Sequence, residues 1–339
     1  MSFKHIKVQS KVVCLKAIKQ DAFYLKYVKD QTPEICLEAV KRNGFVLKYV
    51  KDQTEEICLE AVKHDPYTIR YVKNQTEAIC LTAVKRDGLL LRYVKDQTEE
   101  ICLAAIMQDR YALKYVKHQT SKISLSAVKY NGNALEHVKD QTEEICLAAV
   151  KEKGYALYYV KNQTEAICLE AVKKYGDSLE YVKNQTEAIC LEAVKRNGLA
   201  LKYVKNQTEA ICLEALKHDV NAIGLVKVQT EKICLEAVKR NADALQHIRH
   251  KTDAIYREAL NNDFKVAIRS ISIKKNNVMI VLEASLQHNI KDKIILTEIL
   301  NKFNKDKEVV DFYTKHKLWK HVNFNKLKNH NLFQYSMSI

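Results

Sequence analysis

The sequence predicts an all-α fold: an α-solenoid of tandem 22-residue helix-turn-helix repeats with a degenerate helical C-terminal cap. Three observations support this prediction: a strict repeat, two helix-start signals in each repeat, and a scarcity of helix breakers. The 339-residue chain has only 7 glycines and 2 prolines, which leaves little room for strand turns or flexible linkers. Repeat proteins extend their core along one axis, so the chain length does not count separate globular domains.

The repeat is marked by the pair Gln-Thr, which recurs every 22 residues without insertion or deletion. The first of the clear copies begins at Gln31 and the last at Gln229. Weaker copies at Ser10 and Thr252 keep the same register. A fixed period of this length is the signature of a stacked repeat array, and it predicts about twelve repeats.

Each repeat contains two helix starts, and in the second repeat the second helix is expected over about Gly44 to Lys51. A column of threonines offers N-cap hydroxyls, and eleven residues later a second column is Asn or Asp except at Lys153 and Tyr175. Pro33 directly follows a cap of the first column and Pro66 a cap of the second, as expected for the first position of a helix. Because Pro66 shares its column with Gly44 and most other glycines, we expect no positive φ there.

Ten cysteines fall in one column, at multiples of 22 residues. Zinc sites need ligands a few residues apart, whereas no repeat holds more than one cysteine. Repeats stacked roughly 8–10 Å apart place the Cα atoms beyond the reach of a disulfide. We therefore expect small buried apolar residues with reduced thiols, and neither a metal nor a cofactor.

Composition and termini favour a non-secreted, cytoplasmic protein. The N-terminus lacks an apolar signal-peptide core, and no apolar run approaches the length of a membrane span. Lys and Arg outnumber Asp and Glu by 56 to 41, a net charge of +15. This excess is spread thinly along the repeats, which favours weak attraction to acidic partners over a dedicated nucleic-acid stripe.

Regular columns of lysine and tyrosine allow two interpretations. The lysine columns, which include Lys51 and Lys41, can track a phosphate backbone, and the column of Tyr49 can stack bases. Alternatively, both lysine columns lie in the last turn of a helix, where a cation complements the dipole. We favour this second view: a solvated face with i,i+4 ion pairs such as Glu38–Arg42, and partly buried tyrosines.

Repeats between Thr76 and Lys161 depart together from the pattern, because all of them lose the i,i+4 ion pair. Drift without selection is one explanation. The other is a partner-binding patch, rich in tyrosine and poor in charge as interface centres are. The candidate partner-binding residues depart from the repeat and are expected to point outward: Gln108, Tyr111, Tyr130, Asn133, Tyr155 and Tyr158.

The repeat register fails after Ile271, so two regions are predicted. Residues 1–271 form the helical repeat array, and residues 272–339 form a degenerate helical C-terminal cap or tail. End repeats must differ to stay soluble, which favours a cap. The alternative is a functional tail that uses Trp319 and Lys320.

No arrangement of residues points to an enzyme. The histidines are scattered among columns, and neither a glycine-rich phosphate loop nor an HExxH pattern occurs in the sequence. We therefore expect no catalytic residues and a non-enzymatic binding scaffold for a protein partner. The second hypothesis is a nucleic-acid-binding helical solenoid that uses the lysine columns.

The motif Tyr-Val-Lys-Asn-Gln-Thr-Glu-x-Ile-Cys-Leu-Glu-Ala-Val-Lys occurs at residues 181–195 and recurs with small changes along the array. It resembles a helical repeat family of unassigned function, domain of unknown function 4116. That family is found in giant DNA viruses of amoebae and in amoeba-associated bacteria. The resemblance covers roughly Lys4 to Leu260. It implies a helical array of unknown role and brings no catalytic residues.

Overall fold

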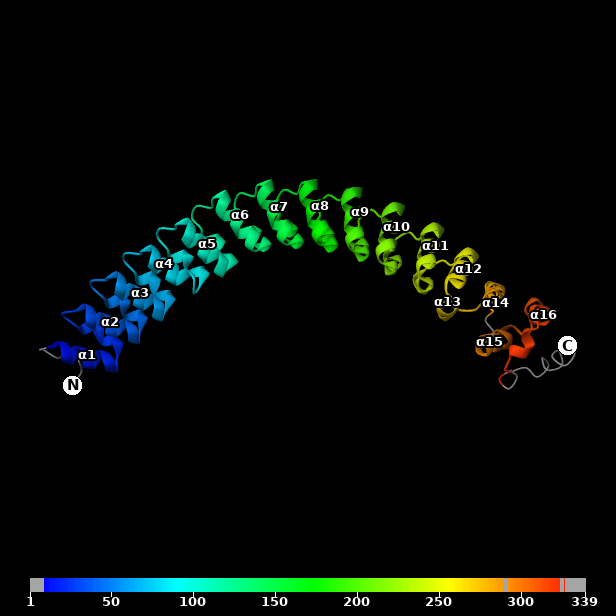
Figure 1. Cartoon of the computed structure of the whole chain (residues 1–339), viewed down its shortest axis with the longest axis horizontal. Helices are drawn as coiled ribbons and strands as arrows, with labels where there is room; N and C mark the ends of the chain where they lie inside the picture. Colours follow the sequence, from blue (N-terminus) through cyan, green and yellow to red (C-terminus); the bar gives the residue numbers. More distant parts are fainter. Residues whose placement is uncertain (1–8, 290–291, 324–325, 327–339) are drawn as a thin grey trace. The chain divides into compact units, whose positions relative to one another are not determined.

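The structure is a computed structural model that describes residues 9–289, 292–323 and 326. It is 72% helical, and the described residues contain no strand. The predicted all-α repeat fold is therefore confirmed. The chain forms two compact parts, Met1–Lys183 and Asn184–Ile339, called here the N-terminal and C-terminal parts (Figure 1).

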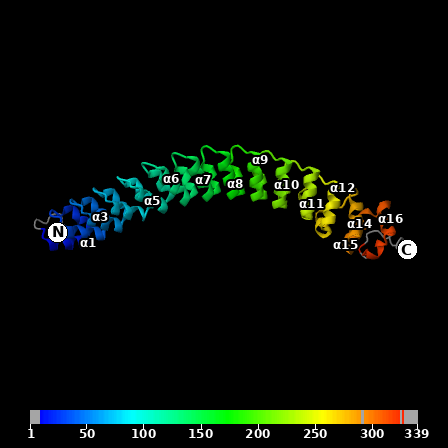
Figure 2. The same ribbon diagram turned by 45° about the horizontal axis from the view of Figure 1, so that its top comes forward.

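In the N-terminal part, α-helices alternate with 3-10 helices of six residues, and successive α-helices lie next to one another (Figure 2). The α-helices are α1 (Lys11–Gln20), α2 (Pro33–Arg42), α3 (Glu55–His64), α4 (Glu77–Val84), α5 (Glu99–Gln108), α6 (Ser121–Tyr130), α7 (Glu143–Glu152) and α8 (Glu165–Lys174). The 3-10 helices are η2 (Ala22–Tyr27), η3 (Gly44–Tyr49), η4 (Pro66–Tyr71), η5 (Gly88–Tyr93), η6 (Arg110–Tyr115), η7 (Gly132–His137), η8 (Gly154–Tyr159) and η9 (Gly176–Tyr181).

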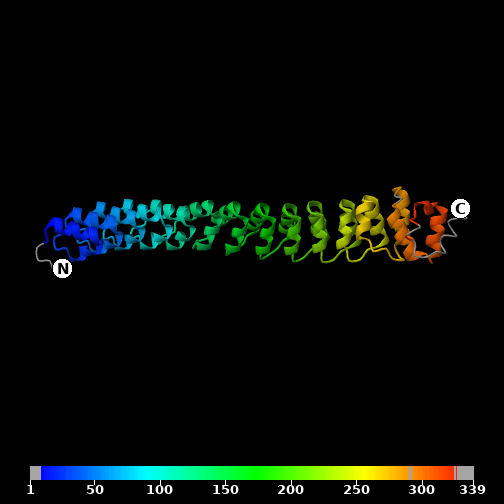
Figure 3. The same cartoon turned by 90° about the horizontal axis from the view of Figure 1, so that it is seen from below.

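The C-terminal part continues the alternation of α-helices and 3-10 helices until the repeats end (Figure 3). Its repeats contain α9 (Glu187–Arg196), η10 (Gly198–Tyr203), α10 (Glu209–His218), η11 (Val220–Leu225), α11 (Glu231–Arg240), η12 (Ala242–His247), α12 (Asp253–Asn262) and α13 (Phe264–Ser270). The helices that follow are α14 (Val278–Gln287), α15 (Lys293–Phe303), α16 (Lys307–Lys315) and η13 (Leu318–His321).

The second helix of a repeat is shorter and tighter than predicted. It was expected from Gly44 to Lys51, but η3 is a 3-10 helix that ends at Tyr49. A 3-10 helix has three residues per turn, so side chains three apart eclipse one another. Gly44 and Leu47 therefore lie on one buried face of η3, and Val50, the C-cap residue that follows the helix, is buried as well.

Both cap columns act as predicted. The Thr32 hydroxyl accepts a hydrogen bond from the backbone N–H three residues later, at 3.4 Å. The Asn43 side-chain oxygen accepts one from the N–H two residues later, at 3.0 Å. Lys153 and Tyr175, the two exceptions in the second column, make no side-chain cap. The local start signals thus position both helices of a repeat.

We expect Thr142→Ala to lower the free energy of unfolding by about 1 kcal/mol, the usual effect of losing an N-cap. Thr142 Oγ1 accepts from the Ile145 N–H at 3.4 Å, and alanine removes that acceptor. Urea unfolding of the full chain, followed by circular dichroism, measures the change. Thr142→Ser keeps the hydroxyl and serves as the control. An unchanged midpoint in the alanine variant would show that this cap does not stabilise the array.

The core uses the same positions in each repeat. In the second repeat, Ile35, Cys36, Ala39 and Val40 of α2 are buried together with Leu47 of η3. All ten cysteines are buried free thiols, as predicted. Burial raises the pKa of the Cys36 thiol to about 11, so this thiol is neutral at pH 7. The cysteines therefore act as small apolar core residues.

The repeated glutamine has a structural role that the sequence analysis missed. Gln97 Nε2 donates to the carbonyl of Leu91 in its own repeat and to that of Tyr115 in the next, both at 3.1 Å. Gln97 Oε1 accepts from the Lys117 N–H at 2.9 Å. Each such glutamine makes three bonds, and two of them cross to the next repeat. The same arrangement occurs at Gln31, Gln53, Gln75, Gln119, Gln141, Gln163, Gln207 and Gln229.

One of the two lysine columns lies outside the helices, contrary to the prediction. Lys51 follows Val50, the C-cap of η3, and so does not belong to a last helical turn. Its Nζ donates to the backbone carbonyl of Lys29 in the preceding repeat at 2.8 Å, and Lys73 does the same to Lys51. This column is a ladder between repeats. Lys41 of the other column lies in the last turn of α2, as expected.

The ion-pair face forms in part. Arg42 pairs with Glu38 at 2.9 Å and also donates to the carbonyl of Lys19 in the preceding repeat at 3.1 Å. Arg42, at the end of α2, therefore has a partner in the previous repeat as well as in its own. Three i,i+4 pairs of this kind are present among the described residues: Glu38–Arg42, Glu214–His218 and Glu236–Arg240.

After the repeats, the C-terminal helices build a small core of their own. Tyr313 is completely buried, and its hydroxyl donates to the carbonyl of Leu296 at 2.7 Å. Trp319 is 5% exposed; its ring lies 5.8 Å from that of Tyr313, and its Nε1 donates to Thr314 Oγ1 at 3.2 Å. Trp319 therefore packs inside these helices and cannot be the surface contact of a functional tail.

Candidate partner-binding surface

All six predicted partner-binding residues lie in the N-terminal part. Their places are Gln108 at the end of α5, Tyr111 in η6, Tyr130 at the end of α6, Asn133 in η7, and Tyr155 and Tyr158 in η8. The exposed fractions of the tyrosines are 40% for Tyr111, 57% for Tyr130, 37% for Tyr155 and 67% for Tyr158. Gln108 is exposed as well, and Asn133 is half-buried. These side chains thus reach the surface as expected, with Asn133 the least accessible.

Gln108 has a structural role in addition to its exposure. Its Nε2 donates to the carbonyl of Arg86 at 3.4 Å, and its Oε1 accepts from the Gly88 N–H at 3.5 Å. Both groups belong to the preceding repeat. Gln108 therefore links two repeats, as Arg42 does in the second repeat. Its departure from the repeat pattern is explained in part by this link.

Arg110 brings Tyr111 and Asn133 together across two repeats. Its Nη2 donates to the Tyr111 hydroxyl at 2.6 Å, and its guanidinium lies 4.6 Å from the centre of that ring. When the Asn133 amide is turned so that its oxygen faces the two cations, this oxygen accepts from Arg110 Nη1 at 3.0 Å and from Lys153 Nζ at 3.2 Å. The Tyr111 ring lies 5.3 Å from that of His137. Burial lowers the pKa of His137, so this imidazole is neutral at pH 7.

A cluster of five tyrosines surrounds η8, and we call it the tyrosine cluster: Tyr155, Tyr158, Tyr159, Tyr175 and Tyr181. Tyr155 stacks on Tyr175 with ring centres 5.2 Å apart and planes inclined by 7°. Tyr158 meets Tyr159 and Tyr181 edge to face, at 5.1 and 5.5 Å. Such pairs have the geometry that aromatic rings favour. The cluster joins the seventh and eighth repeats into one aromatic surface.

Tyr175 was not among the predicted surface residues, and its side chain is 43% exposed. A signal was present, because Tyr175 replaces the Asn or Asp of the second cap column. It makes no cap, and its ring packs on Tyr155 instead. Loss of a capping residue can therefore mark a position that serves another contact.

In the first five repeats, a cation covers the tyrosine beside it. With the Ser or Thr cap of each repeat as position 1, the cation is at position 17 and the tyrosine at position 18. We call these cations the cation row. The ammonium or guanidinium group lies 4.8–4.9 Å from the ring centre in the pairs Lys26–Tyr27, Lys48–Tyr49, Arg70–Tyr71, Arg92–Tyr93 and Lys114–Tyr115.

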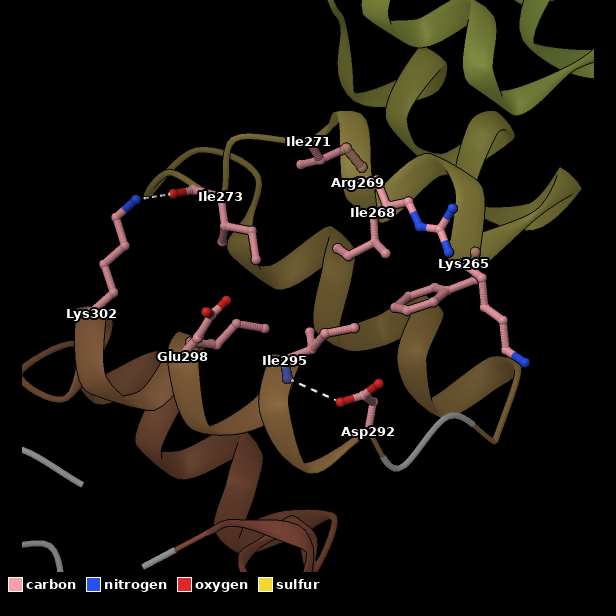
Figure 4. A pocket seen from close by; sticks show the side chains of 11 residues that line it. Lys265, Ile268, Arg269, Ile271, Ile273, Asp292, Ile295, Glu298 and Lys302 are labelled. Atoms are coloured by element: carbon pink, nitrogen blue, oxygen red, sulfur yellow. Dashed lines mark hydrogen bonds between the residues drawn. The ribbon is translucent and has the colours of Figure 1, made fainter. Parts of the chain in front are cut away.

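The C-terminal part contains a hollow of about 520 Å³ between α13, α15 and the segment that follows α13 (Figure 4). Ile268, Ile273 and Ile295 contribute to its apolar lining. Lys302 Nζ donates to the carbonyl of Ile273, and Asp292 accepts from the Ile295 N–H at 3.2 Å as the N-cap of α15. Both charged side chains are thus bonded to the protein's own backbone.

The described residues provide neither a cluster of metal ligands nor a membrane-spanning helix. No three His, Cys, Asp or Glu side chains lie together in a way that could hold a metal ion. None of the described helices has the length and apolar character that crossing a membrane requires.

Tandem pairs of short helices, bonded side chain to backbone from one repeat to the next, define a protein of the α-solenoid class. The family model described as Domain of unknown function (DUF4116) matches more than half of the chain, and the chain belongs to this family. Each match spans about two of the 22-residue repeats. No curated protein and no solved structure matches the chain. The matched residues are 13–54, 32–75, 76–119, 122–165, 142–186 and 164–209.

Proposed function

We propose that the chain is a non-enzymatic scaffold that binds a protein partner through the surface of its fifth to eighth repeats. The observation that supports this most directly is the tyrosine cluster, whose member Tyr158 is 67% exposed. Tyrosine offers a large contact area with few torsions to immobilise, and a few such anchors dominate many interfaces. The proposed surface consists of Gln108, Tyr111, Tyr130, Asn133, Tyr155, Tyr158 and Tyr175.

Two finer proposals come from the family resemblance. The source is a giant virus of amoebae, and the protein works in the host cytoplasm. Ten buried free thiols fit a reducing compartment of this kind.

We expect the double variant Ser126→Glu/Tyr130→Arg to keep its fold and to lose its protein partner. It removes an exposed tyrosine and rebuilds on α6 the pair that Glu38 and Arg42 form on α2. Affinity capture with quantitative mass spectrometry compares the variant with the parent chain, and thermal melting checks the fold. We expect at least a tenfold loss of the captured partner.

Thr82→Glu is the matched control, because it adds the same carboxylate beside Arg86, away from the proposed surface. It should leave capture unchanged. A partner retained by the double variant but lost on Lys320→Ala would assign binding to the C-terminal helices and leave the repeats as a spacer.

A second candidate function is binding of single-stranded nucleic acid along the cation row. Lys48 lies 4.9 Å from the centre of Tyr49 and 6.0 Å from that of Phe23, so cations and rings alternate between repeats. Aromatic platforms beside cations bind single strands without sequence preference. The ladder lysines such as Lys51 are weaker candidates, because their amines already bond to backbone carbonyls. Micromolar binding of an oligonucleotide that falls steeply with added salt would favour this function over the first.

A further inference from the structure

The side chain beside the position-18 residue changes character in the sixth to eighth repeats. In the first five repeats position 17 is Lys or Arg and lies over the tyrosine at position 18. In the next three repeats, position 17 carries a carboxylate, a phenol and a carboxylate, whereas position 18 remains aromatic. The residue pairs there are Glu136–His137, Tyr158–Tyr159 and Glu180–Tyr181, which we call the acid–aromatic row.

The backbone at these pairs is the same in both sets of repeats. Each pair ends a 3-10 helix of six residues. The following C-cap valine has φ −74° and ψ 122° at Val50, φ −75° and ψ 123° at Val138, and φ −75° and ψ 118° at Val182. The change is therefore chemical rather than conformational. Position 17 is a cation in the first five repeats and an acid or a phenol in the next three.

Electrostatics favours a cation from outside the chain. The face of an aromatic ring carries the negative part of its quadrupole and attracts ammonium and guanidinium groups. Glu136 and Glu180 are both exposed and add two carboxylates beside the rings. Tyr158 meets Tyr159 and Tyr181 edge to face, and because it is 67% exposed part of its ring remains accessible to an incoming group. A phosphate or a carboxylate at the same place would meet like charge.

The spacing of the repeats suggests the form of the partner. Helices in contact lie about 8–10 Å apart. A polyproline II segment rises about 9 Å for every three residues and presents each third side chain on one face. Arg or Lys side chains at every third residue of such a segment therefore have about the same spacing as successive repeats.

We propose that the acid–aromatic row binds a segment of a partner protein that carries Arg or Lys at every third residue. The partner's cations lie beside the exposed ring of Tyr158 and the carboxylates of Glu136 and Glu180. This inference rests on the proposed function and adds the chemistry of the partner. It also assigns a role to Glu136 and Glu180, which the proposed surface did not include.

The test uses the full chain and a fluorescein-labelled peptide of three Arg-Pro-Pro units, with anisotropy at physiological salt as the readout. The variant Tyr158→Lys/Glu180→Lys places lysine at position 17 of the seventh and eighth repeats, where the first five repeats have Lys or Arg. We call it the filled chain. We expect it to weaken peptide binding at least tenfold and not to lower the urea midpoint. Glu144→Lys on α7 adds the same charge as Glu180→Lys outside the row, and should weaken binding less than twofold. A Glu-Pro-Pro peptide should not bind.

A gain of binding provides the complementary test. Lys114→Glu gives the fifth repeat the acidic character of the row and should strengthen binding of a four-unit Arg-Pro-Pro peptide several-fold. Equal binding of the Arg-Pro-Pro peptide to the parent and filled chains would overturn the inference, as would tighter binding of a single-stranded oligonucleotide at the row. A captured partner that needs Tyr130 but is not displaced by excess peptide would overturn this inference alone and leave the proposed function standing.

Discussion

The Gln97→Leu variant should lose about 2 kcal/mol of stability, because it leaves three backbone groups without their partner, and the two in part-buried hydrogen bonds each contribute about 1 kcal/mol or more. Those groups are the carbonyls of Leu91 and Tyr115 and the N–H of Lys117, all of which bond to the Gln97 amide. Leucine has a similar volume, so packing changes little while the link between two repeats is lost. Urea unfolding measures the total effect. Amide hydrogen exchange should show faster exchange at Lys117.

Gln20→Leu is the control for this variant, because it makes the same exchange at an exposed position at the end of α1. It should change stability by less than about 0.5 kcal/mol. Gln97→Glu keeps the acceptor for the Lys117 N–H but loses both donors, and should be destabilised nearly as much as the leucine variant. A Gln97→Leu chain as stable as Gln20→Leu would mean that water replaces the glutamine without loss.

Gly88→Ala is expected to destabilise the array by about 2 kcal/mol, in the range for a side chain forced into a packed interior. A Cβ at Gly88 would lie 2.3 Å from the carbonyl oxygen of Ala105 and 3.0 Å from the backbone nitrogen of Asp109, both in the next repeat. Because these are backbone atoms, they cannot relieve the clash by a rotamer change as a flexible side chain can. The two repeats must therefore move apart. Thermal melting of the full chain measures the loss.

Gly224→Ala is the matched control in the C-terminal part. The nearest atoms to a Cβ at Gly224 belong to the His247 ring, at 3.9 Å, and no described glycine has a positive φ. Alanine restricts the unfolded chain, so this exchange should be neutral or stabilising by about 0.5 kcal/mol. Equal melting temperatures for the two variants would show that the backbone near Ala105 moves away from a Cβ at Gly88 without loss of stability.

The repeat period, the caps and the buried cysteines could all be predicted from the sequence because each depends on local rules repeated many times. Thr32 and Asn43 cap helices through bonds that span two or three residues. Such bonds leave a pattern that a single repeat already shows. The type of the second helix was predicted less well, since a six-residue element with buried side chains three apart is too short for its period to be certain.

The candidate surface was predicted in part for the same reason. Tyr130 and Tyr158 stood out because they break the repeat, and the structure exposes both. Tyr175 broke the cap column, but its stacking on Tyr155 depends on a contact between repeats that no local rule describes. Gln108 was assigned to the surface alone, although it also bonds to the preceding repeat. Whether these residues bind a partner remains the proposal that the variants above test.

The sequence by itself determined that this chain is a helical array, where each helix begins, and which side chains form the core. These features follow from hydrogen bonds and periodicities within one repeat. The tertiary structure alone decided what joins the repeats. Gln97 and Lys51 bond to carbonyls about twenty residues away, and a missing Cβ at Gly88 lets a neighbouring backbone approach. A recurring residue shows that a position matters, but its bonding partner becomes visible only when two repeats are placed side by side, because that contact forms between repeats and not within one.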